Sequence, residues 1–349
     1  MKIVQTFLTA DDADVVGAQI AFHLNAGVDF VIAADRGSTD GTTEILESYA
    51  REGYLRRISV SDRPNEYQWR TDLARMAATE HAADWVISSD VDEFWWPRGE
   101  SLADVLTAIP PRYQIVQALV RIFPPSQEDG RFFADRMSTR TSLALPGIEA
   151  PPLEWGLQRA YRADPRLVIA GRDDPSQRRF VPVRGWYPIE VLRYPARSIE
   201  QFERRLSRGV GFRSSVEVGL SEAHGRGELS LRYDELVAAS GPALERGELV
   251  EDTRVSGALD SLRLTDASSG EAAMQFAHPA DARTPLTFRT PDVVDDAAYA
   301  VECAALGEAD MSELERHVDE LERRIAQLEQ GLWPRVVRRI SRLASRTPG

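Results

Sequence analysis

Three carboxylates crowd together in the stretch SSDVDEFWWP, residues 88–97, where Asp90, Asp92 and Glu93 follow an apolar run and precede two tryptophans. Carboxylates held side by side repel each other unless a proton or a cation lies between them. Mg²⁺ and Mn²⁺ prefer oxygen ligands and keep coordination sites for the phosphate oxygens of a substrate. We therefore predict that Asp90 and Asp92 bind Mn²⁺ or Mg²⁺. Glu93 is either a further ligand or a hydrogen-bond partner of the two aspartates. A pair as short as Asp-x-Asp also arises by chance.

The same stretch carries two predictions about side-chain orientation. Because side chains alternate along a strand, Asp90 and Asp92 point the same way if the strand continues through them, while Val91 points into the sheet. Trp95 and Trp96 either belong to the hydrophobic core or form an apolar platform on which a sugar ring stacks. The sequence alone leaves both roles open for the two tryptophans.

A second group of polar residues lies in AADRGSTDGT, residues 33–42. Asp35 ends an apolar run, Gly37 and Gly41 permit a tight turn, and Asp40 is a plausible helix N-cap. Asp35 is therefore placed to accept hydrogen bonds from a nucleobase or from ribose hydroxyls. The alternative is an ordinary strand-to-helix turn with good capping chemistry.

The elements that must position these residues alternate regularly in the first hundred residues. Short apolar runs predict strands, and apolar residues at helical spacing predict helices between them. The strands are expected at 2–8, 28–35, 55–62 and 84–90, and the helices at 11–27, 38–53 and 67–82. This rhythm predicts a parallel sheet with helices on both faces, and ligands of such sheets bind at the carboxyl ends of the strands.

The pattern loosens after Pro97. A short helix is expected at 101–109, a strand at 113–123 and a surface helix at 198–208. Residues 124–195 are rich in Pro, Arg, Asp and Trp and are interpreted as loops and short strands around a site. From about 225 to 295 the sequence indicates little.

The C-terminal region carries two helical patterns. Apolar residues spaced alternately by four and three form a heptad seam: Leu314, Val318, Leu321, Ile325, Leu328 and Leu332. This seam predicts either a coiled coil that joins copies of the chain through 311–332 or an amphipathic helix packed on its own domain. Residues 332–346 combine an apolar face with arginines, which favours either peripheral contact with an anionic membrane or contact with an acidic protein surface.

Composition limits the class of protein. The chain has 349 residues, 43% of them hydrophobic, which is enough for a large globular domain or two smaller ones. A net charge of −13 argues against a general nucleic-acid binder. The single cysteine excludes an internal disulfide framework, and we find neither a signal peptide nor an apolar run long enough to span a membrane. We expect a cytoplasmic protein, with peripheral attachment to the inner face of the cell membrane as an option.

Two motifs in order give a resemblance to a known family. The turn DRGSTDGT at 35–42 and the run ADWVISSDVDEFWWP at 83–97 resemble family 2 glycosyltransferases with a GT-A fold, in particular a bacterial subgroup with the signature ADWVIxxDxDEFWxP. The resemblance covers about residues 1–125. It implies an α/β, Rossmann-like nucleotide-diphospho-sugar transferase fold in a domain at 1–225. An ill-defined extension or linker at 226–295 and a C-terminal helical or coiled-coil region at 296–349 complete the expected division.

The resemblance also implies roles for individual residues. Asp35 would contact the nucleobase, Asp90 the ribose or the metal, and Asp92 the metal that binds the donor diphosphate. Thr9 and Arg70 would line the nucleotide pocket.

Downstream the chain departs from the family pattern. Relatives carry a Gly-Asn-His element where this chain has AGRDDP at 170–175, and a His-Tyr-Pro where it has Arg193-Tyr194-Pro195. Arg193 either binds the donor diphosphate itself or pairs with a buried carboxylate.

The expected function is transfer of a sugar from a nucleotide-diphosphate donor to a hydroxyl of a glycan, lipid-linked or small-molecule acceptor, in polysaccharide or glycoconjugate synthesis. The family implies an inverting, metal-assisted reaction with a carboxylate base beyond Asp-x-Asp. The candidates are Asp174, then Asp173 and Glu154. Because two histidines of the family pattern are missing, the alternative is a catalytically weak GT-A homologue that acts as a binding or assembly module.

Overall fold

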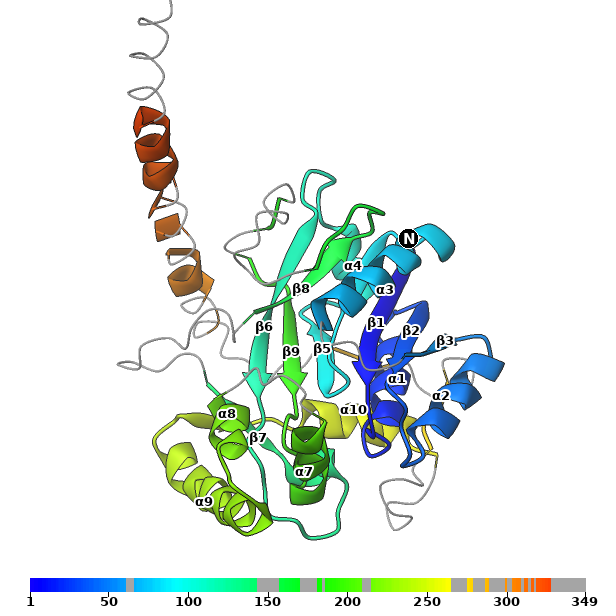
Figure 1. Cartoon of the computed structure of the whole chain (residues 1–349), viewed down its shortest axis with the longest axis vertical. Coiled ribbons are helices and arrows are strands. Elements are labelled where there is room, and N and C mark those ends of the chain that lie inside the picture. Colours follow the sequence, from blue (N-terminus) through cyan, green and yellow to red (C-terminus); the bar gives the residue numbers. More distant parts are fainter. Residues whose placement is uncertain are drawn as a thin grey trace, which may run out of the picture.

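A mixed β-sheet forms the centre of the protein in its computed structural model (Figure 1). The structure describes residues 1–60, 66–142, 157–169, 181–183, 186–208, 215–264, 275–278, 286–288, 299, 303–308, 311–312, 315–316 and 318–327. Within these residues the large sheet has eight strands in the order β3-β2-β1-β4-β8-β6-β9-β5, and β10 pairs with β7 in a small second sheet. The fold is therefore α/β with a mixed central sheet.

The strands of both sheets are β1 (Ile3–Thr9), β2 (Phe30–Asp35), β3 (Leu55–Ser59), β4 (Trp85–Ser88), β5 (Glu93–Pro97), β6 (Ile115–Ile122), β7 (Thr139–Thr141), β8 (Leu157–Arg162), β9 (Ile189–Arg193) and β10 (Leu249–Glu251). The described helices are α1 (Val16–Asn25), α2 (Thr42–Arg51), α3 (Glu66–Glu80), α4 (Leu102–Thr107), α5 (Phe133–Arg136), α7 (Ile199–Ser207), α8 (Ser215–Ser221), α9 (Arg226–Glu245) and α10 (Arg254–Leu262).

The predicted alternation of strands and helices is confirmed from β1 to β4, which pair in parallel. The other half of the sheet, for which no parallel pairing was predicted, is mixed. There β8 runs antiparallel to both β4 and β6, and β5 runs antiparallel to β9. For β5 the cause lies in its connection to β4. A tight turn between the two strands reverses the direction of the chain, whereas a crossover helix would have kept the strands parallel.

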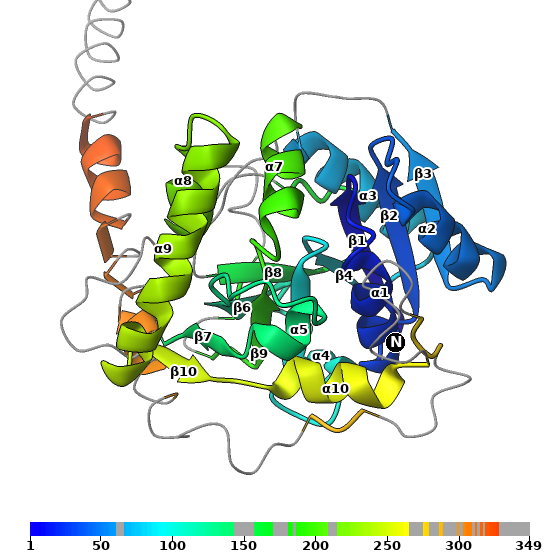
Figure 2. The ribbon, with the colours of Figure 1, turned by 90° about the horizontal axis from the view of Figure 1, so that it is seen from below.

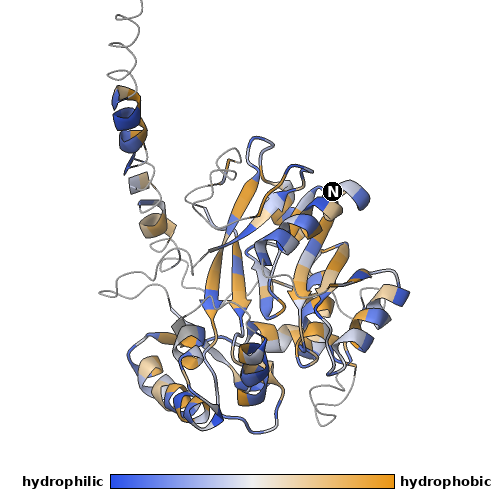
Figure 3. Ribbon diagram, in the orientation of Figure 1, coloured by the Kyte–Doolittle hydropathy of each residue, from blue (hydrophilic) through white to orange (hydrophobic). Residues whose placement is uncertain are grey.

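Both faces of the parallel half are buried, which explains why its strands appear in the sequence as continuous apolar runs. Alternate residues contribute to two clusters: Val31 of β2 packs with α1 and α2 on one face, and Ile32 packs with α3 on the other. Figure 3 shows the central strands as the most hydrophobic part of the ribbon. This two-sided burial holds the carboxyl ends of β1, β2 and β4 rigidly at one edge.

Trp95 and Trp96 belong to the hydrophobic core. Both are buried, and the backbone N–H of Trp95 donates to Nε2 of His23 on α1 at 3.1 Å. Trp96 packs against Phe22 and Phe288. The core role is therefore confirmed, and the alternative of a sugar-stacking platform is wrong because neither ring reaches the surface.

A helical group closes the edge of the sheet at which the strands end. The arrowheads of β1, β6 and β9 point to this edge in Figure 1, and α7, α8 and α9 lie beyond it. Phe202, Leu220 and Tyr233, one from each helix, form a small core of their own. The Ser198 side chain caps α7 by accepting from the Gln201 N–H, which fixes where this helix begins.

Residues 226–262 contain more structure than the sequence indicates. They form α9, β10 and α10, and α10 packs beside α1 (Figure 2). Further along, the described helical segments between 303 and 327 extend away from the sheet in both views, and they expose Val318, Leu321 and Ile325. The other seam leucines and the basic stretch at 332–346 lie outside the described residues. Among the described helices, none is both long and apolar enough to cross a membrane.

Candidate functional site

The Asp-x-Asp pair lies in a turn, so the condition that the strand continues through it is not met. Strand β4 ends at Ser88, and Glu93 begins β5. The Asp90 N–H donates to the Glu93 carboxylate at 3.0 Å, while the Glu93 N–H donates to the Asp90 carbonyl at 3.3 Å. These two reciprocal bonds close the turn and direct both aspartates to the carboxyl edge of the sheet. Val91 borders the pocket and also packs in the hydrophobic core.

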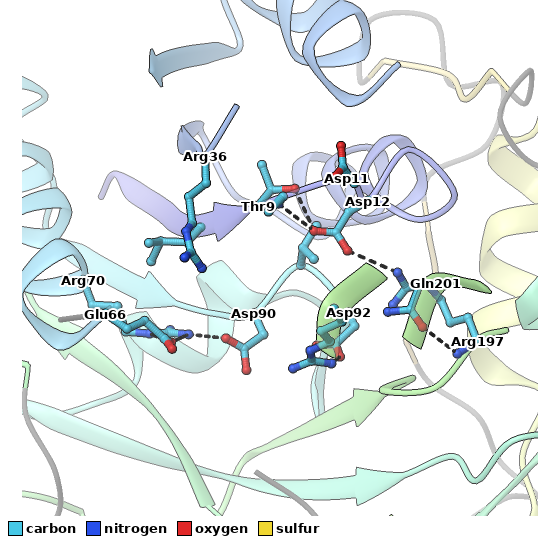
Figure 4. Close-up of a pocket in the computed structure, with 14 residues that line it drawn as sticks. Thr9, Asp11, Asp12, Arg36, Glu66, Arg70, Asp90, Asp92, Arg197 and Gln201 are labelled. Carbon is cyan, nitrogen blue, oxygen red and sulfur yellow. Dashed lines mark hydrogen bonds and ion pairs between the residues drawn. The ribbon is translucent and has the colours of Figure 1, made fainter. Parts of the chain in front are cut away.

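An open pocket lies at this edge. Its lining is strongly charged: Asp11, Asp12, Arg36, Glu66, Arg70, Asp90, Asp92, Arg197 and Arg205, together with Thr9, Gln201 and a few apolar residues. In Figure 4, Asp90 lies between Arg70 and Asp92, and Arg36 points into the same space from the side of Thr9. Of the predicted site residues, the structure thus brings together Thr9, Arg70, Asp90 and Asp92.

Arg70 forms one side of the pocket floor. Its guanidinium contacts Asp90 in a short ion pair and Glu66 at 2.7 Å, and it donates to the Ser89 carbonyl at 3.2 Å. Burial alone would lower the pKa of Arg70, but Asp90 and Glu66 outweigh it and hold this pKa above its ordinary value. Arg70 is therefore a permanent cation that neutralises Asp90 from one side.

Arg193 and Arg205 neutralise the acidic residues from the other side. Arg193 Nε lies 3.4 Å from Asp92 Oδ1, and its Nη2 lies 3.4 Å from Asp90 Oδ2. Arg205 Nη1 lies 3.3 Å from Asp92 Oδ2. Arg193 is 2% exposed and is not among the pocket-lining residues, so the structure shows the arginine–carboxylate pairing that the sequence left as one of two options.

Glu93 completes the acidic cluster from below. Its side chain is fully buried, and its Oε1 accepts from Gln158 at 2.6 Å. Burial, with the neighbouring Asp90 and Asp92, raises the pKa of Glu93 to about 7 despite the opposing charge of Arg193. Glu93 therefore acts as the hydrogen-bond partner that shapes the turn.

The acidic cluster offers oxygen ligands of the kind that Mn²⁺ and Mg²⁺ bind. Oxygen atoms of Asp90, Asp92 and Glu93 lie within 4.8 Å of one another, and carboxylates are the ligands that such cations prefer. The guanidinium of Arg193, however, already borders both aspartates, so a divalent cation between them would meet a fixed positive charge. The three carboxylates are therefore suitable metal ligands, but the position of Arg193 beside them does not suit a bound divalent cation.

Asp35 is buried in its own turn. Its carboxylate accepts from the Ser38 N–H at 2.9 Å and from the Thr43 hydroxyl at 2.6 Å, and Arg57 lies 3.4 Å away. Burial alone would raise the pKa of Asp35, but these hydrogen bonds outweigh the effect of burial and hold this pKa below its ordinary value. This is the turn-forming role that the sequence left as the alternative, and contact with a nucleobase stays a prediction.

The predicted N-cap of α2 is wrong by one residue. Gly41, with φ of 103°, takes the cap position, a conformation that favours glycine, while the Asp40 carboxylate accepts from the Thr42 N–H at 3.1 Å. Asp40 therefore still satisfies an N–H group of the first turn.

Sequence reasoning missed the wall formed by the loop after β1 and the start of α7. Arg197 pairs with Asp12 at 3.3 Å, and Asp12 accepts from the Thr9 hydroxyl at 2.9 Å. Burial raises the pKa of Asp12 although Arg197 opposes it. No sequence signal could have joined Asp12 to an arginine so far along the chain. The predicted base candidates, Glu154, Asp173 and Asp174, lie outside the described residues.

Comparison with known proteins gives one family match. Residues 4–125, well under half of the chain, match the sequence model of glycosyltransferase family 92. The match is to family 92, so assignment to family 2 is not supported. A search of curated proteins gave no match.

Solved structures include several distant likenesses. S. aureus TarS (1–349) aligns at 13% identity and a TM-score of 0.34 over 70% of this chain and 75% of its own. Glucosyl-3-phosphoglycerate synthase from Mycobacterium tuberculosis aligns at 20% identity and 0.26 over 34% and 44%. GalNAc-T7, solved with UDP, GalNAc and Mn²⁺, aligns at 12% identity and 0.37 over 73% and 55%. Scores this low do not by themselves define a function.

Proposed function

We propose that the chain is a glycosyltransferase that moves a sugar from a nucleotide-diphosphate donor to a hydroxyl acceptor. The observation that carries this proposal is the charged pocket at the carboxyl ends of β1 and β4, in which Asp90 and Asp92 lie among arginines. Open α/β sheets bind their ligands at this edge. The segment that matches glycosyltransferase family 92, residues 4–125, contributes most of the pocket wall.

The pocket residues suit the parts of such a donor. Hydroxyls of the ribose are matched by the carboxylate of Asp90, the more exposed of the two aspartates. The diphosphate is matched by Arg205 and Arg36, because guanidinium groups form charge-assisted hydrogen bonds with phosphate oxygens. Thr9 lies on the wall nearest the Asp35 turn, where the nucleobase would lie.

In the proposed reaction the bond between the anomeric carbon and the diphosphate oxygen breaks, and its electron pair leaves with the diphosphate. The acceptor oxygen forms the new bond to the same carbon and gives its proton to a carboxylate base. Arginines that face the diphosphate stabilise the charge that it gains. Inversion in a single displacement, and Asp174, Asp173 or Glu154 as the base, stay predictions. No step is assigned to Mn²⁺ or Mg²⁺, because the guanidinium of Arg193 already borders both Asp90 and Asp92.

Donor binding and turnover test this proposal together. The full chain is mixed with UDP-, GDP-, ADP- and dTDP-sugars, and melting temperature and release of nucleoside diphosphate are measured, since a ligand that binds the native state raises the melting temperature. We expect one donor class to raise the melting temperature and to be consumed. Asp92→Asn should abolish consumption, whereas Asp234→Asn, at an exposed site on α9, should not. If no nucleotide sugar binds, the alternative of an assembly module is favoured.

Two proposals about partners accompany this function. The exposed seam of Val318, Leu321 and Ile325 supports self-association through 311–332. We also propose a cytoplasmic location with peripheral membrane contact through 332–346, which would bring the pocket to a lipid-linked acceptor.

A further inference from the structure

Two arginines and two carboxylates form a closed ring beside the pocket. Arg193 of β9 contacts Asp92 at 3.4 Å and Glu217 at 3.2 Å. Arg205 of α7 contacts the same two carboxylates, Asp92 at 3.3 Å and Glu217 at 2.8 Å. Each positive charge therefore lies between two negative charges, and each negative charge between two positive ones.

The members of this ring differ in their access to the pocket. Glu217 of α8 is fully buried and Arg193 is 2% exposed, whereas the Arg205 side chain is 13% exposed and lines the pocket. Glu217 thus contacts the two arginines on the side that faces away from a ligand. Its position suits a residue that holds both guanidinium groups in place and does not itself touch a substrate.

The ring also reaches the second aspartate. Arg193 Nη2 lies 3.4 Å from Asp90 Oδ2, so one guanidinium borders both carboxylates of the Asp-x-Asp pair. A divalent cation at such a pair neutralises the carboxylates and attracts the diphosphate. Here Arg193 already neutralises the carboxylates, and Arg205 presents a positive charge to the pocket that can attract the diphosphate.

We propose that Arg193 and Arg205, positioned by Glu217, replace the divalent cation of this site, so that the pocket binds the diphosphate of its donor without a metal ion. This inference rests on the proposed function, because it concerns the diphosphate of that donor. Arg193 neutralises the aspartates, and Arg205 donates hydrogen bonds to the phosphate oxygens.

The first experiment compares binding with and without metal. UDP, GDP, ADP and dTDP are titrated into the full chain by calorimetry, once in EDTA and once in Mn²⁺, and Mn²⁺ alone is titrated by electron paramagnetic resonance. We expect one nucleotide to bind with a Kd that changes less than about threefold between the two buffers. We also expect Mn²⁺ alone to remain unbound.

The contrary outcomes separate this inference from the proposed function. Nucleotide binding that requires Mn²⁺, or a stoichiometric Mn²⁺ site in the protein alone, overturns the inference and leaves the glycosyltransferase proposal intact. Failure of every nucleotide to bind in either buffer overturns both.

Variants then test the individual residues in EDTA. Arg205→Gln should weaken nucleotide binding by about tenfold or more, through the loss of a charge-assisted contact. The matched control is Arg204→Gln, the neighbouring residue on α7, which pairs with exposed Glu200. Binding by Arg205→Gln at the strength of the unaltered chain would overturn the inference.

The test of Glu217 must separate an effect on nucleotide binding from an effect on the stability of the fold. Glu217→Gln should weaken nucleotide binding in EDTA, because both guanidinium groups lose an anchor. Glu222→Gln, at an exposed position just after α8, is the matched control. A lower melting temperature with unchanged nucleotide binding in EDTA would show that Glu217 only stabilises the fold.

Discussion

Arg197 and Asp14 form a two-pronged ion pair that joins the segment before α7 to the segment before α1. Arg197 Nε lies 2.5 Å from Asp14 Oδ2, and its Nη2 lies 3.0 Å from Oδ1. Arg197 is buried and also contacts Asp12 of the pocket wall. The pair therefore fixes the helical group at the edge of the sheet where the pocket opens.

Removal of one partner of this pair should destabilise the protein. Asp14→Asn leaves the buried Arg197 with less compensating charge, and we expect a loss of about 3 kcal/mol in the free energy of unfolding. Urea denaturation at neutral pH measures this loss. Glu200→Gln, which removes an exposed pair on α7, should cost less than about 0.5 kcal/mol. Equal effects of the two substitutions would contradict the role assigned to Asp14.

A second buried network, away from the pocket, makes stability depend on Glu190 of β9. Its carboxylate contacts Arg121 of β6 and Arg254 of α10, each at 2.8 Å. We expect Glu190→Gln to cost about 4 kcal/mol, because two buried arginines lose their shared partner. Calorimetric unfolding of this variant beside Glu222→Gln measures the difference, and a variant as stable as the unaltered chain would contradict the prediction.

The same network predicts how stability responds to acid. Burial raises the pKa of Glu190, but Arg254 and Arg121 outweigh it and hold this pKa well below its ordinary value. The stability that Glu190 contributes is therefore present above the ordinary glutamate pKa and is lost as the pH falls below it. Glu190→Gln should unfold with a weaker dependence on acid pH than the unaltered chain.

Local patterns predicted the parallel half of the fold because buried parallel strands leave continuous apolar runs, such as Val31–Ala34 in β2. The alternation of Asp90, Val91 and Asp92 left strand and turn open. The hydrogen bond from the Asp90 N–H to Glu93, a contact that no periodicity reveals, forms the turn. Strand β8 went unrecognised because LQRAYR mixes arginines with small and aromatic residues in the middle of a sheet.

The residues of the candidate site also fall into those that the sequence predicts and those that it does not. Asp90 and Asp92 were predictable because they follow a strongly patterned strand, and Thr9 and Arg70 because the family resemblance implied them. The partnership of Arg193 with Glu217 was not, since an ion pair between residues on a strand and a later helix leaves no periodic signal. Charge compensation of this kind is a property of the tertiary structure alone.

The exposed seam near the C-terminus predicts self-association. Val318, Leu321 and Ile325 follow heptad spacing and are exposed on the described helical segment, which favours the coiled-coil alternative over packing on the same domain. We expect a dimer or higher oligomer in sedimentation equilibrium. Leu321→Glu should shift the chain to monomer by placing like charges at the seam, whereas Glu320→Gln, at a neighbouring exposed position, should not. A monomer at every concentration of the unaltered chain would contradict this prediction.

His23 gives the fold a dependence on mildly acidic pH. The ring is buried between α1 and β5; Nδ1 bonds to the Gln19 carbonyl at 2.8 Å, and Nε2 accepts the Trp95 N–H, so the neutral form is the one that fits. Burial lowers the pKa of His23 to about 4. Because the unfolded chain takes up this proton near pH 6.5, the contribution of His23 is present above that pH and is lost as the pH falls toward 4.

The size of this effect follows from the two pKa values. At pH 5, protonation of His23 in the unfolded chain should lower the free energy of unfolding by about 2 kcal/mol relative to neutral pH. Urea midpoints measured at pH 7.5 and pH 5 for the unaltered chain and for His23→Gln isolate it, because the carboxylates titrate in both proteins. We expect the unaltered chain to lose more stability between the two pH values. If both proteins lose the same amount, His23 is not buried in its neutral form, and the contact that joins α1 to β5 differs from the one described.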